Sequence, residues 1–260
     1  MKRGFLTASA FALILILIGS ADAGDWVEPD TYDAPMGTII IDGDSNDWEN
    51  VDLITDSEFK TAEDEWVTFE EYNGGVWNGP EDHTTSVAFA WDSEYLYLYT
   101  YVLDDEHEHV SDVFWDGDAA QIVFADEDRL AVTQLYNYAL ADNQKDIILG
   151  NEQVTAGGLL EEDVAIVRDD DKGVTIYEAR FSAEILGLAE FEAGMGIGVG
   201  VCINDGDFDT PGQKGWSGWG PHAAVFGKNG DKTGLVILSS ETISVDANSK
   251  LPTTWGTLKY

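Results

Sequence analysis

The sequence predicts an all-β fold, an antiparallel β-sandwich that follows a cleaved signal peptide. Large side chains alternate through residues 87–91 and again through 95–102, and a short acidic turn joins the two runs. A period of two is typical of strands with two different faces, and two such runs around a polar turn indicate a β-hairpin. Residues 114–124 form a third run around a Trp-Asp-Gly-Asp corner. We therefore expect an antiparallel sheet with one face on the core.

Residues 1–23 carry the features of a secretory signal peptide. Lys2 and Arg3 precede an apolar run over residues 5–18, and small residues lead to a predicted cleavage site after Ala23. The alternative is an uncleaved anchor helix, which would need a longer apolar stretch. No other segment of the sequence is apolar enough to span a bilayer. We expect a secreted protein, either extracellular or periplasmic.

The chain is strongly acidic, with 50 Asp and Glu residues against 13 Lys and Arg and a net charge of −37. Nucleic acids and anionic membrane surfaces are therefore poor partners. The carboxylates either keep the protein soluble in a salty or calcium-rich exterior, or some of them bind Ca²⁺, and both interpretations stay open. The single cysteine, Cys202, excludes an intrachain disulfide, so the fold must be held by its core.

The sequence divides into an N-terminal arm at residues 24–36, one domain at 37–238 and a C-terminal tail at 239–260. Residues 38–41 predict a short strand, and Trp48 is expected as a buried plug beneath the Asp/Gly loop that follows it. Further strands are predicted at residues 130–139, 163–168, 173–181, 195–203 and 235–238, with loop-rich connections at 143–160 and 204–214.

Several short motifs follow one another with sensible spacing along this domain. They are residues 41–48, 90–97, 115–124, 177–181, 198–205, Trp219 and residues 232–235. In this order they resemble family 9 carbohydrate-binding modules and their wider DOMON-like relatives, and the resemblance covers about residues 37–238. It implies a β-sandwich, sugar binding on an aromatic clamp, and bound calcium.

The resemblance implies roles for individual residues. Trp115 corresponds to one clamp aromatic, Gln121 to a polar residue on the central strand, and Asn204 to the first member of an Asn-Asp pair. Two further positions depart from the family, because a polar residue is replaced by Cys202 and a basic one by Tyr136. The fold inference carries over despite these changes, whereas the sugar specificity does not.

The second clamp tryptophan of the family falls at Phe226 or Gly227, so the opposing side of the clamp is absent or is supplied by another aromatic. A pyranose has an apolar C–H face that an indole ring can cover, and a polar rim that amides and carboxylates can satisfy. The alternative is that Trp115 plugs the end of the sandwich. The predicted carbohydrate-binding residues are Trp115, Asp116, Gln121, Tyr136, Tyr138, Asn204, Trp216, Trp219 and Phe226.

Carboxylates at alternate positions in two acidic loops are candidates for Ca²⁺, because a hard cation needs converging oxygens. In so acidic a chain such spacing also arises by chance. The loop after residue 204 lacks the terminal Glu of an EF-hand. His107 and His109 are interpreted as part of a solvated loop rather than as a metal pair. The predicted calcium ligands are Asp42, Asp44, Asp205, Asp207 and Asp209.

Together these observations predict a non-catalytic protein that binds a polysaccharide or oligosaccharide of the xylan, cellulose or glucan type, as an accessory to polysaccharide breakdown. It is expected to be a monomer. One rival is a haem-binding electron-transfer protein of the same superfamily, for which Met195 and His222 are the only tempting axial pair. A cell-surface adhesion protein is another rival. A glycoside hydrolase is supported by family association alone, because no carboxylate pair stands out among so many.

Overall fold

The computed structural model describes residues 31–61, 63–141, 144–152, 154 and 156–244, so the predicted signal peptide lies outside the described residues. Four short 3-10 helices occur there: η1 (Ser45–Trp48), η2 (Glu161–Asp163), η3 (Pro221–Ala223) and η4 (Gly230–Lys232). Within these ranges no helix is long and apolar enough to cross a membrane. The strands are β1 (Thr31–Met36), β2 (Ile54–Thr55), β3 (Phe59–Lys60), β4 (Trp66–Val67), β5 (Glu70–Glu71), β6 (His83–Trp91), β7 (Tyr95–Asp104), β8 (Ala119–Ala125), β9 (Val132–Ala141), β10 (Asp146–Glu152), β11 (Val164–Asp169), β12 (Val174–Ser182), β13 (Gly196–Asp205), β14 (Gly215–Trp219) and β15 (Gly234–Thr242).

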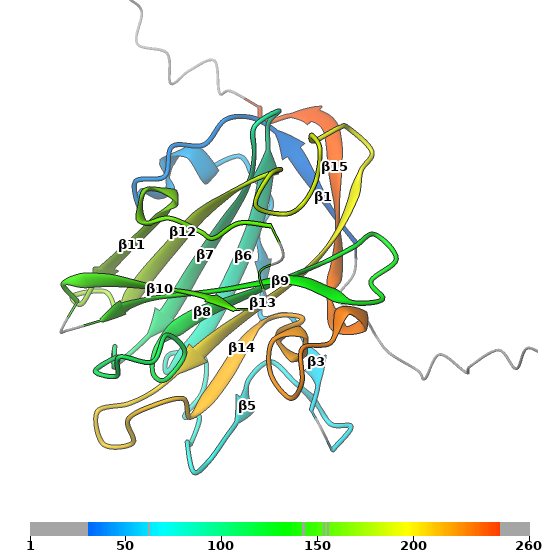
Figure 1. Ribbon diagram of the computed structural model, residues 1–260. Helices are drawn as coiled ribbons and strands as arrows, with labels where there is room; N and C mark the ends of the chain where they lie inside the picture. Colours follow the sequence, from blue (N-terminus) through cyan, green and yellow to red (C-terminus); the bar gives the residue numbers. More distant parts are fainter. Residues whose placement is uncertain (1–30, 62, 142–143, 153, 155, 245–260) are drawn as a thin grey trace, which may run out of the picture.

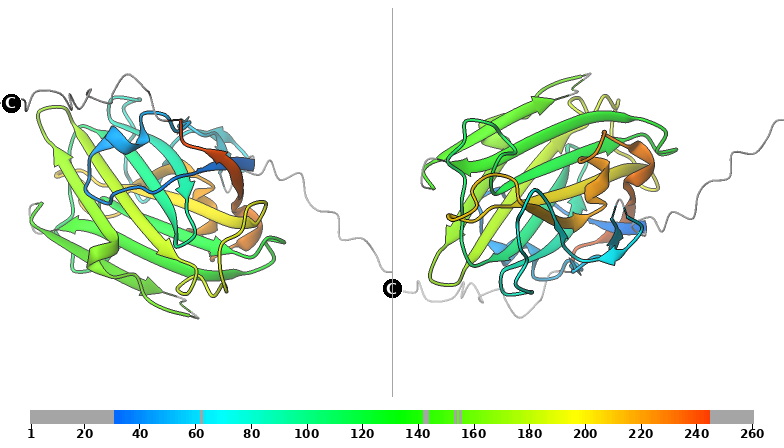
Figure 2. Two further views of the ribbon diagram at one scale, coloured as in Figure 1. Left: turned by 90° about the horizontal axis from the view of Figure 1, so that it is seen from above. Right: turned by 90° about the horizontal axis from the view of Figure 1, so that it is seen from below.

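The strands form two packed layers, which confirms the predicted β-sandwich (Figures 1 and 2). The first layer has the order β10-β9-β8-β13, with β14 paired to the second half of β13. The second layer has the order β6-β7-β12-β11, and β15 with β1 links the two layers at one side. The pairings within both layers are antiparallel, whereas β1 runs parallel to both β15 and β6.

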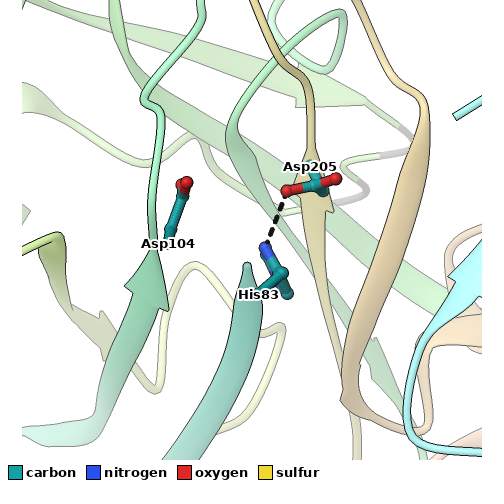
Figure 3. Close-up of side chains that lie close together, drawn as sticks. All are labelled: His83, Asp104 and Asp205. Atoms are coloured by element: carbon teal, nitrogen blue, oxygen red, sulfur yellow. Dashed lines mark hydrogen bonds and ion pairs between the residues drawn. The ribbon is translucent and has the colours of Figure 1, made fainter. Parts of the chain in front are cut away.

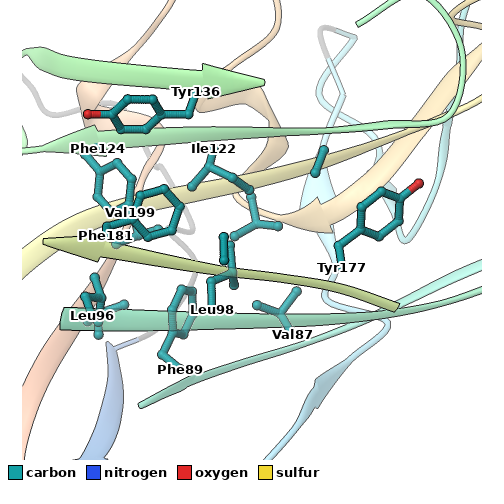
Figure 4. Packing of buried hydrophobic residues seen from close by; sticks show 14 of the residues in the cluster. Val87, Phe89, Leu96, Leu98, Ile122, Phe124, Tyr136, Tyr177, Phe181 and Val199 are labelled. Atoms are coloured by element: carbon teal, nitrogen blue, oxygen red, sulfur yellow. The ribbon is translucent and has the colours of Figure 1, made fainter. Parts of the chain in front are cut away.

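The core lies between the two layers and is made of alternate residues from their facing strands (Figure 4). Phe124 from β8 meets Phe181 from β12 edge to face, with ring centroids 4.8 Å apart. Such an aromatic pair contributes about 0.5–1.5 kcal/mol beyond its buried area. Leu98 from β7 and Ile122 from β8 belong to the same buried cluster. This apolar interior holds the two layers together without a disulfide.

A buried glutamate anchors the Asp/Gly loop on the outer face of the second layer. Glu178 accepts hydrogen bonds from the backbone N–H of Asp42 (3.0 Å) and Gly43 (2.6 Å) and from the indole N–H of Trp48 (2.6 Å). Burial raises the pKa of Glu178, although these three donors act in the opposite direction. Trp48 is buried and stacks on Tyr99, so the prediction of a plug is confirmed.

Three predicted segment boundaries were wrong, two of them because β1 and β15 pair although they lie at opposite ends of the chain. The predicted arm is a strand from Thr31 onward, since Tyr32 and Ala34 are buried and β1 pairs with β15. β15 itself continues to Thr242, inside the predicted tail. The predicted loop at residues 143–160 contains β10, which pairs with residues 135–141 of β9. The predicted hairpins at β6–β7 and β11–β12 are both present.

Candidate functional site

A groove of about 310 Å³ lies on the outer face of the first layer, and we call it the aromatic groove. Its position follows from strand register, because Gln121 on β8 is opposite Asn137 on β9 and Cys202 on β13. Residues directly opposite one another in a ladder share a face of the sheet. The side chains that line the groove include the aromatics Tyr72, Trp115, Trp216 and Phe226 and the polar residues Gln121, Glu152, Gln213 and Lys228.

The aromatic residues of the groove differ in how far they reach solvent. Trp115 is 38% exposed and Phe226 is 56% exposed, so both have free ring surface. Trp216 is buried behind them, 5.3 Å from Phe226 and 5.1 Å from Tyr72 between ring centroids, and its indole N–H donates to Glu70 at 3.0 Å. Tyr72 is also 41% exposed, so the groove has three exposed rings around the buried ring of Trp216.

The loop that presents Phe226 has an unusual backbone. Phe226 has a φ of 55° and Lys228 a φ of 69°, in the left-handed region that bulky residues rarely adopt. The ammonium of Lys228 donates to the carbonyl of Ala224 at 3.0 Å, which ties the loop back on itself. Backbone strain of this kind is concentrated at ligand clamps and active sites, where surrounding contacts hold it.

Asn204 connects the polar floor of the groove to the loop that carries Trp115. Its side-chain oxygen accepts from Gln121 at 3.0 Å and from Gln213 at 2.8 Å, while its amide donates to the carbonyl of Trp115 at 2.8 Å. Asn204 is itself fully buried. It therefore positions the exposed indole and fixes the orientation of two amides. Asp116 lies beside it and accepts from the backbone N–H of Gln213 at 3.2 Å.

Three predicted binding residues face the core instead of the groove, which corrects the prediction. Tyr136 and Tyr138 are completely buried between the layers, and the hydroxyl of Tyr136 donates to backbone carbonyls at 2.8 and 2.9 Å. Trp219 packs on Phe89 in the same core. Side chains alternate along a strand, so Trp216 and Trp219, three positions apart on β14, must point to opposite faces.

The opposite face of β9 supplies the polar residues that the sequence analysis missed. Asn137 donates to Glu152 at 2.9 Å, and Glu152 lines the groove. The side-chain oxygen of Asn137 is buried and has no hydrogen-bond partner among the described residues. The alternation in residues 132–141 separates the two faces of β9 correctly, but it cannot tell which face lies inside the sandwich.

Ionisable residues, most of them buried, gather at the end of the sandwich near the loop that carries Trp115, and we call this region the acidic end. Three sets have ligand atoms within 4.8 Å of one another. Figure 3 shows the first of them, in which His83 and Asp205 are 3.1 Å apart. The sets are His83, Asp104 and Asp205; Asp104, His107 and Asp118; and Asp82, Asp105 and Asp207.

The pKa values at the acidic end are strongly perturbed. Burial and the charge of Asp205 raise the pKa of Asp104 to about 7, against the opposing effects of His83 and Arg168. Burial and the same neighbour raise the pKa of Asp207 to about 6. Burial lowers the pKa of His107 to about 4, so this imidazole is neutral at physiological pH. Crowded carboxylates of this kind favour the binding of protons or cations.

The predicted calcium ligands are distributed over several places. Asp205 and Asp207 belong to two different sets at the acidic end, and Asp209 belongs to none of the sets found in the described chain. Asp42 accepts from the N–H of Asp44, and Asp44 accepts from Asn46, so both carboxylates shape their own turn. These bonds give the first acidic loop a local structural explanation.

The interpretation of the histidine loop as solvated was wrong. His107, Glu108 and His109 are all buried. The loop folds back under the start of β8, where Asp118 accepts the backbone N–H of Glu108 at 2.5 Å. Asp118 belongs to the Trp-Asp-Gly-Asp corner that the sequence analysis identified. No local pattern in the sequence indicates that its partners are His107 and Glu108, which precede that corner in the chain.

Two other features of the structure are alternative candidates for the functional site. A larger cavity of about 590 Å³ lies beside β3 and β4, and five glutamates with Trp66 and Trp77 are among its lining. The candidate haem ligands Met195 and His222 lie in different clusters, because Met195 packs on the core whereas His222 bonds to Glu70 and contacts Phe59. The aromatic groove differs from both of these features, because it combines exposed rings with a hydrogen-bonded amide floor.

Comparison with known proteins gives one family and a set of similar folds. Residues 51–241 match the family described as "Carbohydrate family 9 binding domain-like". A carbohydrate binding module family 9 from Caldicellulosiruptor kristjanssonii, in complex with cellotriose, is 14% identical with a TM-score of 0.57, covering 86% of this chain and 98% of that one. The same module in complex with glucose is 14% identical with a TM-score of 0.58, covering 84% and 100%. No curated protein matches the sequence.

Proposed function

Because this chain belongs to the carbohydrate family 9 binding domain-like family, we propose that its aromatic groove binds a sugar ring stacked on Trp115. The protein is then a secreted, non-catalytic binding module that assists polysaccharide breakdown. A glucan of the cellulose type is the first candidate ligand, since the similar modules hold cellotriose and glucose.

The exposed indole of Trp115 at the groove is the observation that carries this proposal. Its free ring surface, together with Phe226 on the same groove, offers an apolar contact for the C–H face of a pyranose. Gln121, Gln213 and Glu152 offer donors and acceptors for the hydroxyls around the ring. This is the combination of apolar surface and a few oriented polar groups that small-ligand sites use.

A shallow open groove of this composition favours moderate affinity. We expect a Kd between about 10⁻³ and 10⁻⁶ M, equivalent to about −4 to −8 kcal/mol. Isothermal titration with cello-oligosaccharides, xylo-oligosaccharides and glucose measures this directly. Binding to none of these sugars, and to no glycan on an array, would contradict the proposal.

We also propose that Ca²⁺ binds at the rim of the acidic end, between Asp82, Asp105 and Asp207. These three carboxylates lie within ligand distance of one another, and they bring only oxygen atoms, which Ca²⁺ prefers. The neighbouring carboxylates raise the pKa of both Asp105 and Asp207, after the effect of burial. A bound cation would relieve this repulsion and would stabilise the folded state by mass action.

A further inference from the structure

We propose that Asp104, His107 and Asp118 bind one divalent transition-metal ion in the interior of the acidic end, separately from the Ca²⁺ proposed at its rim. Their three ligand atoms lie within 4.8 Å of one another, and all three residues are buried. The proposal is independent of sugar binding. Two carboxylates and an imidazole are a ligand set of mixed oxygen and nitrogen, which suits Zn²⁺ and its first-row neighbours.

The orientation of His107 is the first reason. Its Nε2 lies 2.9 Å from the carbonyl oxygen of Leu140, and a carbonyl can only accept, so Nε2 carries the proton. The Nδ1 atom of the neutral ring therefore presents a lone pair. This atom is buried, has no hydrogen-bond partner among the described residues, and faces Asp118 Oδ2 at 3.5 Å. A lone pair facing a carboxylate in the interior needs a cation or a proton between them.

The spacing fits a metal ion. Two ligand atoms that are each about 2.1 Å from a tetrahedral zinc ion are about 3.4 Å apart. The distance of 3.5 Å between His107 Nδ1 and Asp118 Oδ2 matches this value. Asp104, at the end of β7, completes three protein ligands, and water would take the fourth position.

The groups behind the ligands hold them in place, as outer hydrogen bonds do in metal sites. The second nitrogen of His107 donates to a backbone carbonyl. Asp118 Oδ2 accepts from the N–H of Glu108, and Asp118 Oδ1 accepts from the N–H of Gly206 at 3.0 Å. His107 and Asp118 therefore have their orientations fixed by backbone from other segments of the chain, and Asp104 accepts from the nearby N–H of Glu106 at 2.9 Å.

The charge balance also favours a divalent cation. Asp104, Asp118 and Asp205 are buried close together, and the guanidinium of Arg168 lies 3.9 Å from Asp104. The three carboxylates therefore lie close together around one guanidinium, and a divalent cation between them would reduce their mutual repulsion. Asp205 is already hydrogen-bonded to His83, so we assign Asp104 and Asp118 as the carboxylate ligands (Figure 3).

Calcium is a poorer candidate for this position. Ca²⁺ takes six to eight oxygen ligands, whereas the interior site presents two carboxylates and an imidazole nitrogen. The competing explanation is a proton, with a protonated Asp118 donating to His107 Nδ1. The two explanations differ in metal content, so they can be separated by experiment.

The test measures Zn²⁺ bound to the purified full chain after chelation and reconstitution, by elemental analysis and by titration calorimetry in the presence of Ca²⁺. We expect one equivalent of Zn²⁺, a higher melting temperature with Zn²⁺ than with chelator, and at least tenfold weaker binding in His107→Gln. The matched control is Asp82→Asn at the calcium rim, which should keep the Zn²⁺. A chain that binds no Zn²⁺, or a His107→Gln variant that binds it equally well, would show that a proton bridges these groups instead.

If His107→Gln does not fold, Co²⁺ in the unmodified chain provides the second measurement. Co²⁺ bound by an imidazole and two carboxylates in a four-coordinate site gives visible absorption bands, which Zn²⁺ should displace. The absence of a saturable visible band at one equivalent of Co²⁺ would reject the site without any variant.

Discussion

Replacing Trp115 with alanine separates the binding surface from the core. The ring is 38% exposed at the aromatic groove, whereas Trp216 in the same groove is 1% exposed. Trp115→Ala should therefore lower sugar affinity in a folded protein. Trp216→Ala should instead destabilise the fold, by about 3–5 kcal/mol for a buried tryptophan.

The expected loss of affinity follows from the exposed area. A tryptophan of about 250 Å² that is 38% exposed offers about 95 Å², of which one sugar face covers roughly half. Counting the matching area on the sugar, about 100 Å² leaves water, which contributes about 2.5 kcal/mol at 25 cal/mol/Å². This corresponds to an increase in Kd of about 70-fold.

Titration calorimetry with cellotriose measures the affinity, and urea unfolding measures the stability of the same samples. Phe226→Ala is the matched control on the groove, since its ring is also exposed, and it should weaken binding without unfolding the chain. A Trp115→Ala variant that binds cellotriose within about threefold of the unmodified protein would refute the stacking role. A variant that unfolds would place Trp115 in the core.

Three further predictions concern the anchors of the fold. Glu178→Ala should lower the free energy of unfolding in urea by about 3–5 kcal/mol, because two buried donors and one half-buried donor lose their acceptor. A loss below about 1 kcal/mol would show that Glu178 does not anchor its loop. Chelation of Ca²⁺ should lower the melting temperature, and Asp207→Asn should abolish that response. An equal response in the variant would show that Ca²⁺ binds at another place. Burial acts to raise the pKa of Asp92, but hydrogen bonds from Tyr97, Thr38 and two backbone amides lower it overall. The contribution of Asp92 to the stability of the folded state is therefore fully present above the ordinary pKa of 3.8, and it is lost as the pH falls through the lowered value. Asp92→Asn should therefore destabilise the protein by more at pH 7 than at pH 2, as measured by urea unfolding at both pH values. Equal losses of stability at the two pH values would contradict this.

The parts of the fold that the sequence predicted are those formed by neighbouring segments. The β6–β7 hairpin pairs residues on either side of one short turn, so the local alternation contains all the information it needs. β1 and β10 escaped prediction for different reasons. β1 finds its partner at the far end of the chain, and its proline suggested an arm. The run of Ile147 to Leu149 in β10 is short and lies among loop residues.

The candidate site was predicted in part. Trp115, Gln121 and Phe226 line the groove, whereas the assignment of Tyr136 placed the wrong face of β9 outside. Shifting the alternation of a strand by one residue moves all the side chains of one face from the core to the solvent. The sequence of a single strand does not show which of its two faces is buried. Only the position of the opposite layer does so.

The sequence by itself determined the fold class, the family and the strong negative charge, because each depends on composition or on short motifs of residues close together in the chain. Only the tertiary structure decided which rings meet solvent and which carboxylates meet one another. Asp104, His107 and Asp118 lie on a strand, a loop and a corner whose distances in space depend on the packing of the two layers. Burial in that packed interior, which no local pattern records, is what perturbs their charges.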